Sequence, residues 1–236
     1  MTAARSRLAV LTDRWELPPS SAARLDALLQ LLAHDPTAPT AITDPVQAAE
    51  SHVADALDAL ALVEVRAATA VADLGAGAGF PGLVLALALP DASVALVESV
   101  GRKGAFMERA LEVAGVPNAR VVVARAEAWP DGLGAHDLVT ARALAPLNVL
   151  AEYAAPLLRP GGSLVAWKGR RDATEEADGA AAAALLGLEP RGIHRTESRP
   201  GAEDHHLHVL TKVAPTPDRF PRREGMARKR PLRASA

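Results

Sequence analysis

The sequence predicts an α/β fold: a mostly parallel, doubly wound sheet with an N-terminal helical cap and a C-terminal antiparallel hairpin. From residue 69 onward, short apolar runs alternate with helix-like segments, which is typical of parallel strands joined by crossover helices. Before residue 66, the apolar residues recur at helical spacing. The last two apolar runs have no helix between them, so they are expected to pair antiparallel.

The cap is expected to contain two helices. The first, over 20–33, is capped by Ser20 or Ser21. Its apolar face is formed by Leu25, Leu28, Leu29 and Leu32. A connector rich in proline and threonine covers 35–45, and the second helix spans 46–63. The apolar face of the second helix is formed by Val53, Leu57 and Leu60.

The rest of the fold follows from the alternating runs. Six of them are expected to be strands: 70–74, 94–98, 120–124, 137–141, 163–167 and 205–212. Helices are expected at 82–89, 102–114, 146–158 and 173–187, and the closing hairpin pairs 188–196 with 205–212. The chain therefore divides into a helical cap at 1–65, a ligand-binding domain at 66–214 and a tail at 215–236.

The composition excludes several kinds of chemistry. The 236 residues include no cysteine, which excludes disulfides, cysteine-ligated zinc, iron–sulfur clusters and cysteine nucleophiles. No run approaches the roughly 18 apolar residues of a membrane span, and the first ten residues lack the apolar core of a signal peptide. We therefore expect a cytoplasmic protein with no membrane partner.

Positive charge is concentrated in the tail. The segment 218–236 carries a net charge of +5, although the whole chain carries −2. A cationic tail gains affinity for a polyanion by displacing counterions from phosphates, which favours a contact with RNA. The alternative is a solvated terminus. In either case we expect the tail to be independent of any site in the preceding domain.

A glycine-rich turn gives the sharpest sign of a ligand. The strand that ends in Asp73 leads into a turn containing Gly75, Gly77 and Gly79, where a ligand can approach the backbone, and a helix starts at Pro81 or Gly82. Glu98 ends the next strand, 25 residues after Asp73. A carboxylate at that place can accept hydrogen bonds from both hydroxyls of a ribose.

Two nucleoside cofactors fit this layout. Residues 77–82 also spell G-x-G-x-x-G, so NAD is one alternative, and a purely structural turn is another. The carboxylate of Asp73 disfavours a pyrophosphate but suits the positively charged end of S-adenosylmethionine. D-x-G-x-G-x-G at a strand end is also the spacing typical of methyltransferases. The residues therefore favour S-adenosylmethionine and a Rossmann-like methyltransferase fold.

Longer segments resemble one family. DLGAGAGFPG, ARAEAW, TARA and LVAWKG are similar to segments of the RsmG (GidB) family, which methylates N7 of a guanosine in 16S ribosomal RNA, and the resemblance spans roughly 40–232. The resemblance implies that Gly75 and Phe80 line the methionine and ribose side and that Glu98 binds the ribose. It also implies that Ala126 and Glu127 border the adenine and that Arg142 lies beside the cofactor and the target base. Its partner would be 16S ribosomal RNA or the small ribosomal subunit.

The chemistry of that reaction is compatible with this composition. N7 of guanine has a free lone pair, so it can attack a sulfonium methyl group without a general base, and alignment and electrostatics supply the catalysis. Arg142 and Lys168 follow strands at the carboxyl edge, where open α/β sheets bind ligands, and are the candidate catalytic residues. The alternative for both is an ion pair or a solvated loop charge.

Further basic residues are candidates for RNA binding. They are Arg102, Lys103, Arg222, Arg223, Arg228, Lys229 and Arg230. We expect no metal, since His205 and the nearby His206 and His208 face opposite sides of a strand and no carboxylate set completes a site. We also expect a monomer. A small-molecule methyltransferase and a non-catalytic module that binds S-adenosylmethionine and RNA during ribosome assembly remain the rival functions.

Overall fold

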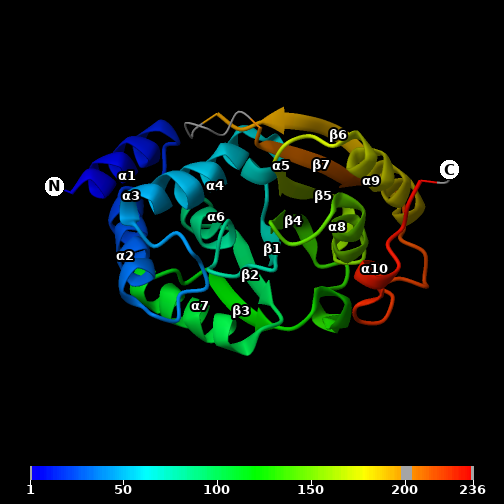
Figure 1. Cartoon of the computed structure of the whole chain (residues 1–236), viewed down its shortest axis with the longest axis horizontal. Helices are drawn as coiled ribbons and strands as arrows, with labels where there is room; N and C mark the ends of the chain where they lie inside the picture. Colours follow the sequence, from blue (N-terminus) through cyan, green and yellow to red (C-terminus); the bar gives the residue numbers. More distant parts are fainter. Residues whose placement is uncertain (1, 198–203, 235–236) are drawn as a thin grey trace.

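The fold is built around one seven-stranded sheet with helices on both faces (Figure 1). The computed structural model describes residues 2–197 and 204–234. The strand order is β3-β2-β1-β4-β5-β7-β6. The strands are β1 (Ala70–Leu74), β2 (Ser93–Glu98), β3 (Ala119–Val123), β4 (His136–Arg142), β5 (Leu158–Lys168), β6 (Leu188–Arg195) and β7 (His206–Lys212).

The predicted topology is confirmed. The five strands from β3 to β5 pair in parallel, and β7 pairs antiparallel with both β5 and β6. Because β4 lies beside β1 with Thr140 opposite Asp73, the loops that follow these two strands meet at the carboxyl edge of the sheet. This edge, at the point where the strand order reverses around β1, is where ligands bind in open α/β sheets.

The crossover helices also lie where the sequence places them. They are α6 (Gly82–Ala88), α7 (Gly101–Ala114), α8 (Leu147–Ala154) and α9 (Ala173–Leu186). Helix α9 begins after Asp172, whose carboxylate accepts hydrogen bonds from the backbone N–H groups of Thr174 and Glu175. Helix α8 ends four residues earlier than predicted, because Pro156 has no backbone N–H to continue the helical hydrogen bonds.

Successive residues of the strands face two different cores. Val71 belongs to the core beneath α6, α7 and the N-terminal helices, and Ala72 belongs to the core beneath α8, α9 and the C-terminal segment. This alternation follows from the two-residue period of a strand, and burial on both faces explains why the central strands β1 and β2 are mostly apolar. The cap therefore shares a core with one face of the sheet, and the boundaries at residues 65 and 214 stay a prediction.

The N-terminal segment is helical as expected but less regular. It contains α1 (Ala3–Arg14), α2 (Ser21–His34), α3 (Pro45–Ala48), the π-helix η1 (Ala49–Ala54), α4 (Asp55–Leu57), the 3₁₀-helix η2 (Asp58–Ala61) and α5 (Val63–Arg66). The single helix predicted over 46–63 is thus a series of short helical turns. Ser20 occupies the N-cap of α2 without a side-chain hydrogen bond to the helix, so the predicted serine cap is wrong. Helix α1 was not predicted.

The basic tail folds back onto the domain. It contains α10 (Met226–Lys229), and Phe220 and Ala227 are buried in the core beside α8. The amide of Asn148 in α8 donates a 2.6 Å hydrogen bond to the carbonyl of Leu232. The alternative of a solvated terminus is therefore wrong for the described part of the tail. Of the described chain, no helix combines the length and the apolar character that a membrane crossing requires.

Candidate active site

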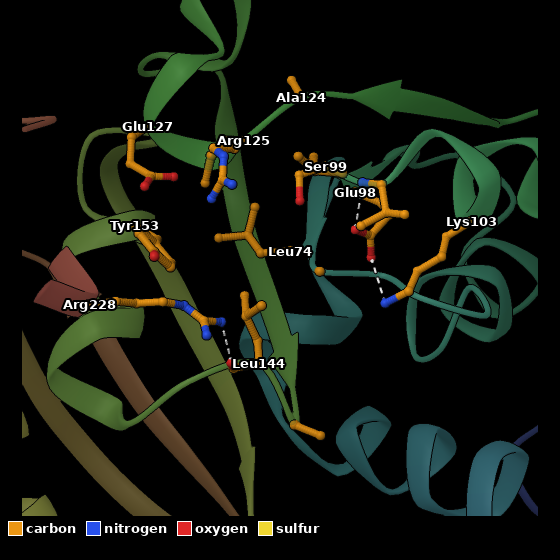
Figure 2. Close-up of a pocket in the computed structure, with 15 residues that line it drawn as sticks. Leu74, Glu98, Ser99, Lys103, Ala124, Arg125, Glu127, Leu144, Tyr153 and Arg228 are labelled. Carbon is orange, nitrogen blue, oxygen red and sulfur yellow. Dashed lines mark hydrogen bonds and ion pairs between the residues drawn. The ribbon is translucent and has the colours of Figure 1, made fainter. Parts of the chain in front are cut away.

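A cavity of about 430 Å³ opens at the carboxyl edge of β1 to β4 (Figure 2). It is lined by Leu74, Gly75, Val97, Glu98, Ser99, Val100, Lys103, Ala124, Arg125, Ala126, Glu127, Ala143, Leu144, Tyr153 and Arg228. Four residues assigned to the cofactor from the sequence lie in this lining, namely Gly75, Glu98, Ala126 and Glu127. The cavity thus lies at the edge of the sheet where the sequence predicts the cofactor site.

The glycine turn forms one side of the cavity. Gly75, Gly77 and Gly79 all have positive φ angles, of 65°, 60° and 94°, which residues with a side chain rarely adopt. A Cβ atom on Gly75 would lie 2.6 Å from Cδ1 of Leu144, on the opposite side. The missing side chain thus lets Leu144 pack against the turn at this wall of the cavity. Gly77 and Gly79 are outside the lining, although the N–H of Gly77 donates to Glu98 at 3.3 Å.

Asp73 supports the turn from below. Asp73 is fully buried, and its carboxylate accepts hydrogen bonds from the N–H of Gly82 at 2.9 Å and from the hydroxyl of Thr140 at 2.8 Å. Burial raises the pKa of this carboxyl to about 6, although both hydrogen bonds oppose the shift. Asp73 lies outside the cavity lining, and its expected contact with the cofactor stays a prediction. Its carboxylate fixes the start of α6 against β1 and β4.

Glu98 has the environment expected for a ribose-binding carboxylate. Its side chain is 6% exposed, and Oε1 accepts a 2.9 Å hydrogen bond from the N–H of Val100. The ammonium of Lys103 lies 3.7 Å from Oε2. These contacts hold the carboxylate at the wall of the cavity, where its remaining acceptor capacity can meet hydroxyl groups. Lys103, predicted to bind RNA, thus lies in the cofactor cavity.

The far end of the cavity is partly built by the C-terminal segment. Oε1 of Glu127 accepts a 2.9 Å hydrogen bond from the N–H of Gly225, and Nη2 of Arg228 donates at 2.7 Å to the carbonyl of Leu144. In Figure 2, Arg228 extends beside Tyr153 toward Leu144. The expectation that the tail is independent of the cofactor site is therefore wrong, because residues of the tail line the same cavity.

Arg142 lies outside the cavity lining and joins β4 to the cap. Its Nη1 donates at 2.9 Å both to Oδ2 of Asp55 and to the carbonyl of Ser51, and its Nη2 lies 3.0 Å from Nδ1 of His52. Phe80 stacks on the His52 ring at a centroid distance of 4.7 Å, and the Arg142 guanidinium lies 5.9 Å from the Phe80 centroid. Arg142 and Phe80 thus contact the cap, and their expected contacts with the cofactor stay a prediction.

Lys168 also forms the ion pair that the sequence left open as the alternative. Its ammonium lies 2.5 Å from Oε1 of Glu175 and donates at 3.2 Å to the carbonyl of Ala145. The same Glu175 oxygen accepts from the N–H of Leu147 at 2.8 Å. The loop of residues 143–146, which contributes two lining residues to the cavity, is thereby fixed to α9. Its first residue, Ala143, has a φ of 53°, a strained value for a residue with a side chain.

The predicted RNA-binding residues divide into two groups. Arg222 forms a two-pronged ion pair with the buried Glu152, so the expectation that it meets RNA does not fit its place. Arg102, at the start of α7, is exposed. Three of the exposed cations of the tail, which we call the outward basic set, are Arg223, Lys229 and Arg230.

The sheet order and this cavity define a class. A parallel sheet whose last strand is antiparallel, with a glycine turn after β1 and a carboxylate at the end of β2, is the arrangement of S-adenosylmethionine-dependent methyltransferases. Solved structures of that class share the fold. The antibiotic-resistance methyltransferase Kmr is 21% identical with a TM-score of 0.52, covering 63% of this chain and 88% of that chain. A SAM-dependent methyltransferase from Aquifex aeolicus is 16% identical with a TM-score of 0.50, and the match covers 61% of this chain and 82% of that chain.

Sequence relatives give the family. A sequence model of GidB, the rRNA small subunit methyltransferase G, matches residues 24–206. Ribosomal RNA small subunit methyltransferase G of Rubrobacter xylanophilus is 43% identical over 188 residues, 77% of this chain and 72% of that protein. The protein of the same name from Chloroflexus aggregans is 41% identical over 196 residues, 82% of each chain. The chain belongs to the GidB family, and S-adenosylmethionine is its cofactor.

Proposed function

We propose that this protein transfers the methyl group of S-adenosylmethionine to N7 of a guanosine in 16S ribosomal RNA. The observation that carries the proposal is the cavity that places Gly75, Glu98 and Glu127 around one space in a chain of the GidB family. Glu98 would hold the ribose, Ala126 and Glu127 would border the adenine, and the side of Gly75 and Leu144 would receive the methionine part.

The chemistry requires alignment more than proton transfer. When bound, the cofactor supplies an electrophilic methyl group, and N7 of guanine attacks it with a lone pair that carries no proton. The cavity agrees with this requirement, because the residues around Gly75 are Leu74, Ala143 and Leu144, which offer hydrocarbon and backbone atoms. The chain therefore needs to exclude water there and to hold the base in line with the methyl group.

Arg142 and Lys168 would act by positioning the loop between them. Arg142 fixes the end of β4 to the cap, and Lys168 fixes the carbonyl of Ala145 through its pairing with Glu175. Both ends of the 143–146 loop, which lines the cavity with Ala143 and Leu144, are thus held. We assign no direct contact with the base to either side chain.

The proposal includes a place of action and a partner surface. The protein would act in the cytoplasm as a monomer, without a metal ion, on 16S ribosomal RNA or on the small ribosomal subunit. The outward basic set and Arg102 would meet phosphates of the RNA.

The test is transfer of labelled methyl from S-adenosylmethionine to ribosomal RNA. Purified small-subunit and large-subunit RNA, each free and in its subunit, are incubated with the protein. We expect label in small-subunit RNA only. Label in small molecules of a cell extract but in no RNA would favour a small-molecule methyltransferase, and binding of cofactor and RNA without transfer would favour a non-catalytic module.

A further inference from the structure

The C-terminal segment contacts the cofactor cavity at three points. Glu224 pairs with Arg125 at 3.2 Å, the N–H of Gly225 donates to Glu127 at 2.9 Å, and Arg228 donates to the carbonyl of Leu144 at 2.7 Å. Arg125, Glu127 and Leu144 all line the cavity, and they follow β3 and β4 about a hundred residues earlier in the chain. The segment 224–228, which we call the C-terminal wall, is therefore attached to the cavity itself.

We propose that Arg228 is a cofactor-binding residue and that the C-terminal wall closes the adenine end of the cofactor site. This inference rests on the proposed function, since it takes the cavity to be the cofactor site. Arg228 is the only residue of α10 in the cavity lining, and its guanidinium lies beside Leu144 and Tyr153 (Figure 2). The adenine and the C-terminal wall would then both contact the part of the cavity formed by Glu127 and Leu144.

The chemistry of Arg228 suits an adenine. A guanidinium is planar, stacks on aromatic rings and donates several hydrogen bonds, while the purine ring offers nitrogen acceptors at its edge. Arg228 uses one nitrogen for the carbonyl of Leu144 and lies beside Tyr153, so its guanidinium is held at the cavity wall. A lysine ammonium carries the same charge but is not planar and has no forked pair of N–H donors. It therefore cannot both stack on the adenine ring and hold the hydrogen bond to Leu144 in the same geometry.

The wall also connects the cofactor site to the RNA-binding surface. Arg222 and Arg228 point inward, to Glu152 and Leu144, and hold the segment on the domain. The outward basic set flanks the wall on both sides along the chain and is exposed. Phosphates that bind the outward basic set would stabilise the docked wall, so cofactor and RNA are expected to increase each other's affinity by the same factor.

The experiment measures binding of S-adenosylhomocysteine by calorimetry to the parent, Arg228→Ala, Arg228→Lys and Lys229→Ala. Lys229 is the next residue of the same short helix and is exposed, so Lys229→Ala removes the same charge away from the cavity. We expect about a tenfold loss of affinity in Arg228→Ala, of the size that a charged hydrogen bond provides. Arg228→Lys should recover part of it, and Lys229→Ala should stay within twofold. The parent's affinity should rise at least threefold when small-subunit RNA is added.

A second measurement uses the unmodified protein. S-adenosylhomocysteine should slow hydrogen exchange of the backbone amides at 224–228, including the Gly225 N–H that donates to Glu127. Affinity within twofold of the parent in Arg228→Ala, together with unchanged exchange, would overturn the inference and leave the proposed function intact. A parent that does not bind S-adenosylhomocysteine would instead contradict the proposed function.

Discussion

Arg142, at the end of β4, donates a 2.9 Å hydrogen bond from Nη1 to Oδ2 of Asp55 in the N-terminal segment. The Asp55 side chain is 4% exposed and that of Arg142 is 18% exposed, so water screens this ion pair only weakly. Oδ1 of Asp55 faces His205 at 3.4 Å, and the Asp55 carbonyl accepts from the indole of Trp167 at 2.9 Å. One residue of the cap is thus bonded to β4 and β5 and faces His205 just before β7.

Removing the guanidinium should therefore affect both stability and turnover. We expect Arg142→Ala to lower the free energy of unfolding by about 3 kcal/mol, because the buried Asp55 loses its strongest partner. Misalignment of the loop after β4 should lower the methyl-transfer rate by about a hundredfold, with a smaller loss of cofactor affinity. Denaturant titration, calorimetry and initial rates measure the three quantities.

Two variants distinguish positioning from a contact with the base. Arg142→Lys should recover little, because the forked donor is lost. Asp55→Asn leaves Arg142 in place but weakens its anchor, and it should lower turnover in the same direction. If Arg142→Ala keeps turnover within about threefold of the parent, the positioning role is contradicted.

Asp73 should make stability depend on pH in an uncommon direction. Its pKa in the folded state, about 6, is above the ordinary 3.8, so the protonated form favours folding. This contribution to the free energy of unfolding is fully present below about pH 3.8 and is lost as the pH rises through about 6. The difference between the two pKa values corresponds to about 3 kcal/mol. In Asp73→Asn the amide can still accept from Gly82 and donate to the Thr140 hydroxyl, without a titrating group.

Comparison of the two proteins isolates this effect, since other titrating groups contribute equally to both. Between pH 3.5 and pH 7.5 the free energy of unfolding of the parent should fall by about 3 kcal/mol relative to that of Asp73→Asn. Parallel pH profiles would show that the Asp73 carboxyl titrates at its ordinary pKa.

Gly75 should be required for an open cofactor cavity. A Cβ atom there would lie 2.6 Å from Cδ1 of Leu144, and the φ of 65° strains any side chain. We expect Gly75→Ala to weaken binding of S-adenosylhomocysteine at least tenfold and Gly75→Arg to abolish it. Gly134→Ala is the matched control, because Gly134 has a φ of 60° and open space around its Cβ position. Equal affinities of Gly75→Ala and Gly134→Ala would mean that the ligand lies elsewhere.

The outward basic set should determine much of the salt dependence of RNA binding. Each phosphate contact contributes about 0.7 to 0.9 to the slope of log affinity against log salt concentration, so replacing all three residues by Ala should reduce the slope by about 2 to 3. Filter binding from low to moderate salt measures the slope. The control replaces three exposed arginines away from the tail, Arg14, Arg120 and Arg191. An equal decrease in the control would indicate diffuse attraction rather than a contact surface.

Local sequence patterns predict most of the fold. The strands and crossover helices of 70–212 can be predicted because apolar runs and helical spacing are local features of the sequence. Helix α1 has only three buried apolar residues, Ala4, Leu8 and Leu11, among arginines, which gives too narrow a stripe to recognise. The apolar spacing at 46–63 could not distinguish a regular helix from consecutive π, α and 3₁₀ turns, since all of them bury a similar face.

The site is predictable where its residues lie near one motif. Gly75 and Glu98 follow from the glycine turn and the next strand, and Ala126 and Glu127 follow from the family resemblance. Leu144, Tyr153 and Arg228 could not be found this way, because they reach the cavity only through tertiary contacts between distant segments. The sequence places Arg142 at a strand end, but it does not show that Asp55 lies 2.9 Å from the Arg142 guanidinium.

The identity of the methylated nucleoside tests the central claim most directly. Small-subunit ribosomal RNA labelled by the protein from S-adenosylmethionine is digested to nucleosides and separated by chromatography, with Gly75→Arg as the inactive control. We expect the label to co-migrate with 7-methylguanosine for the parent and to be missing for Gly75→Arg. Label in any other nucleoside, or equal label with Gly75→Arg, would contradict the central claim.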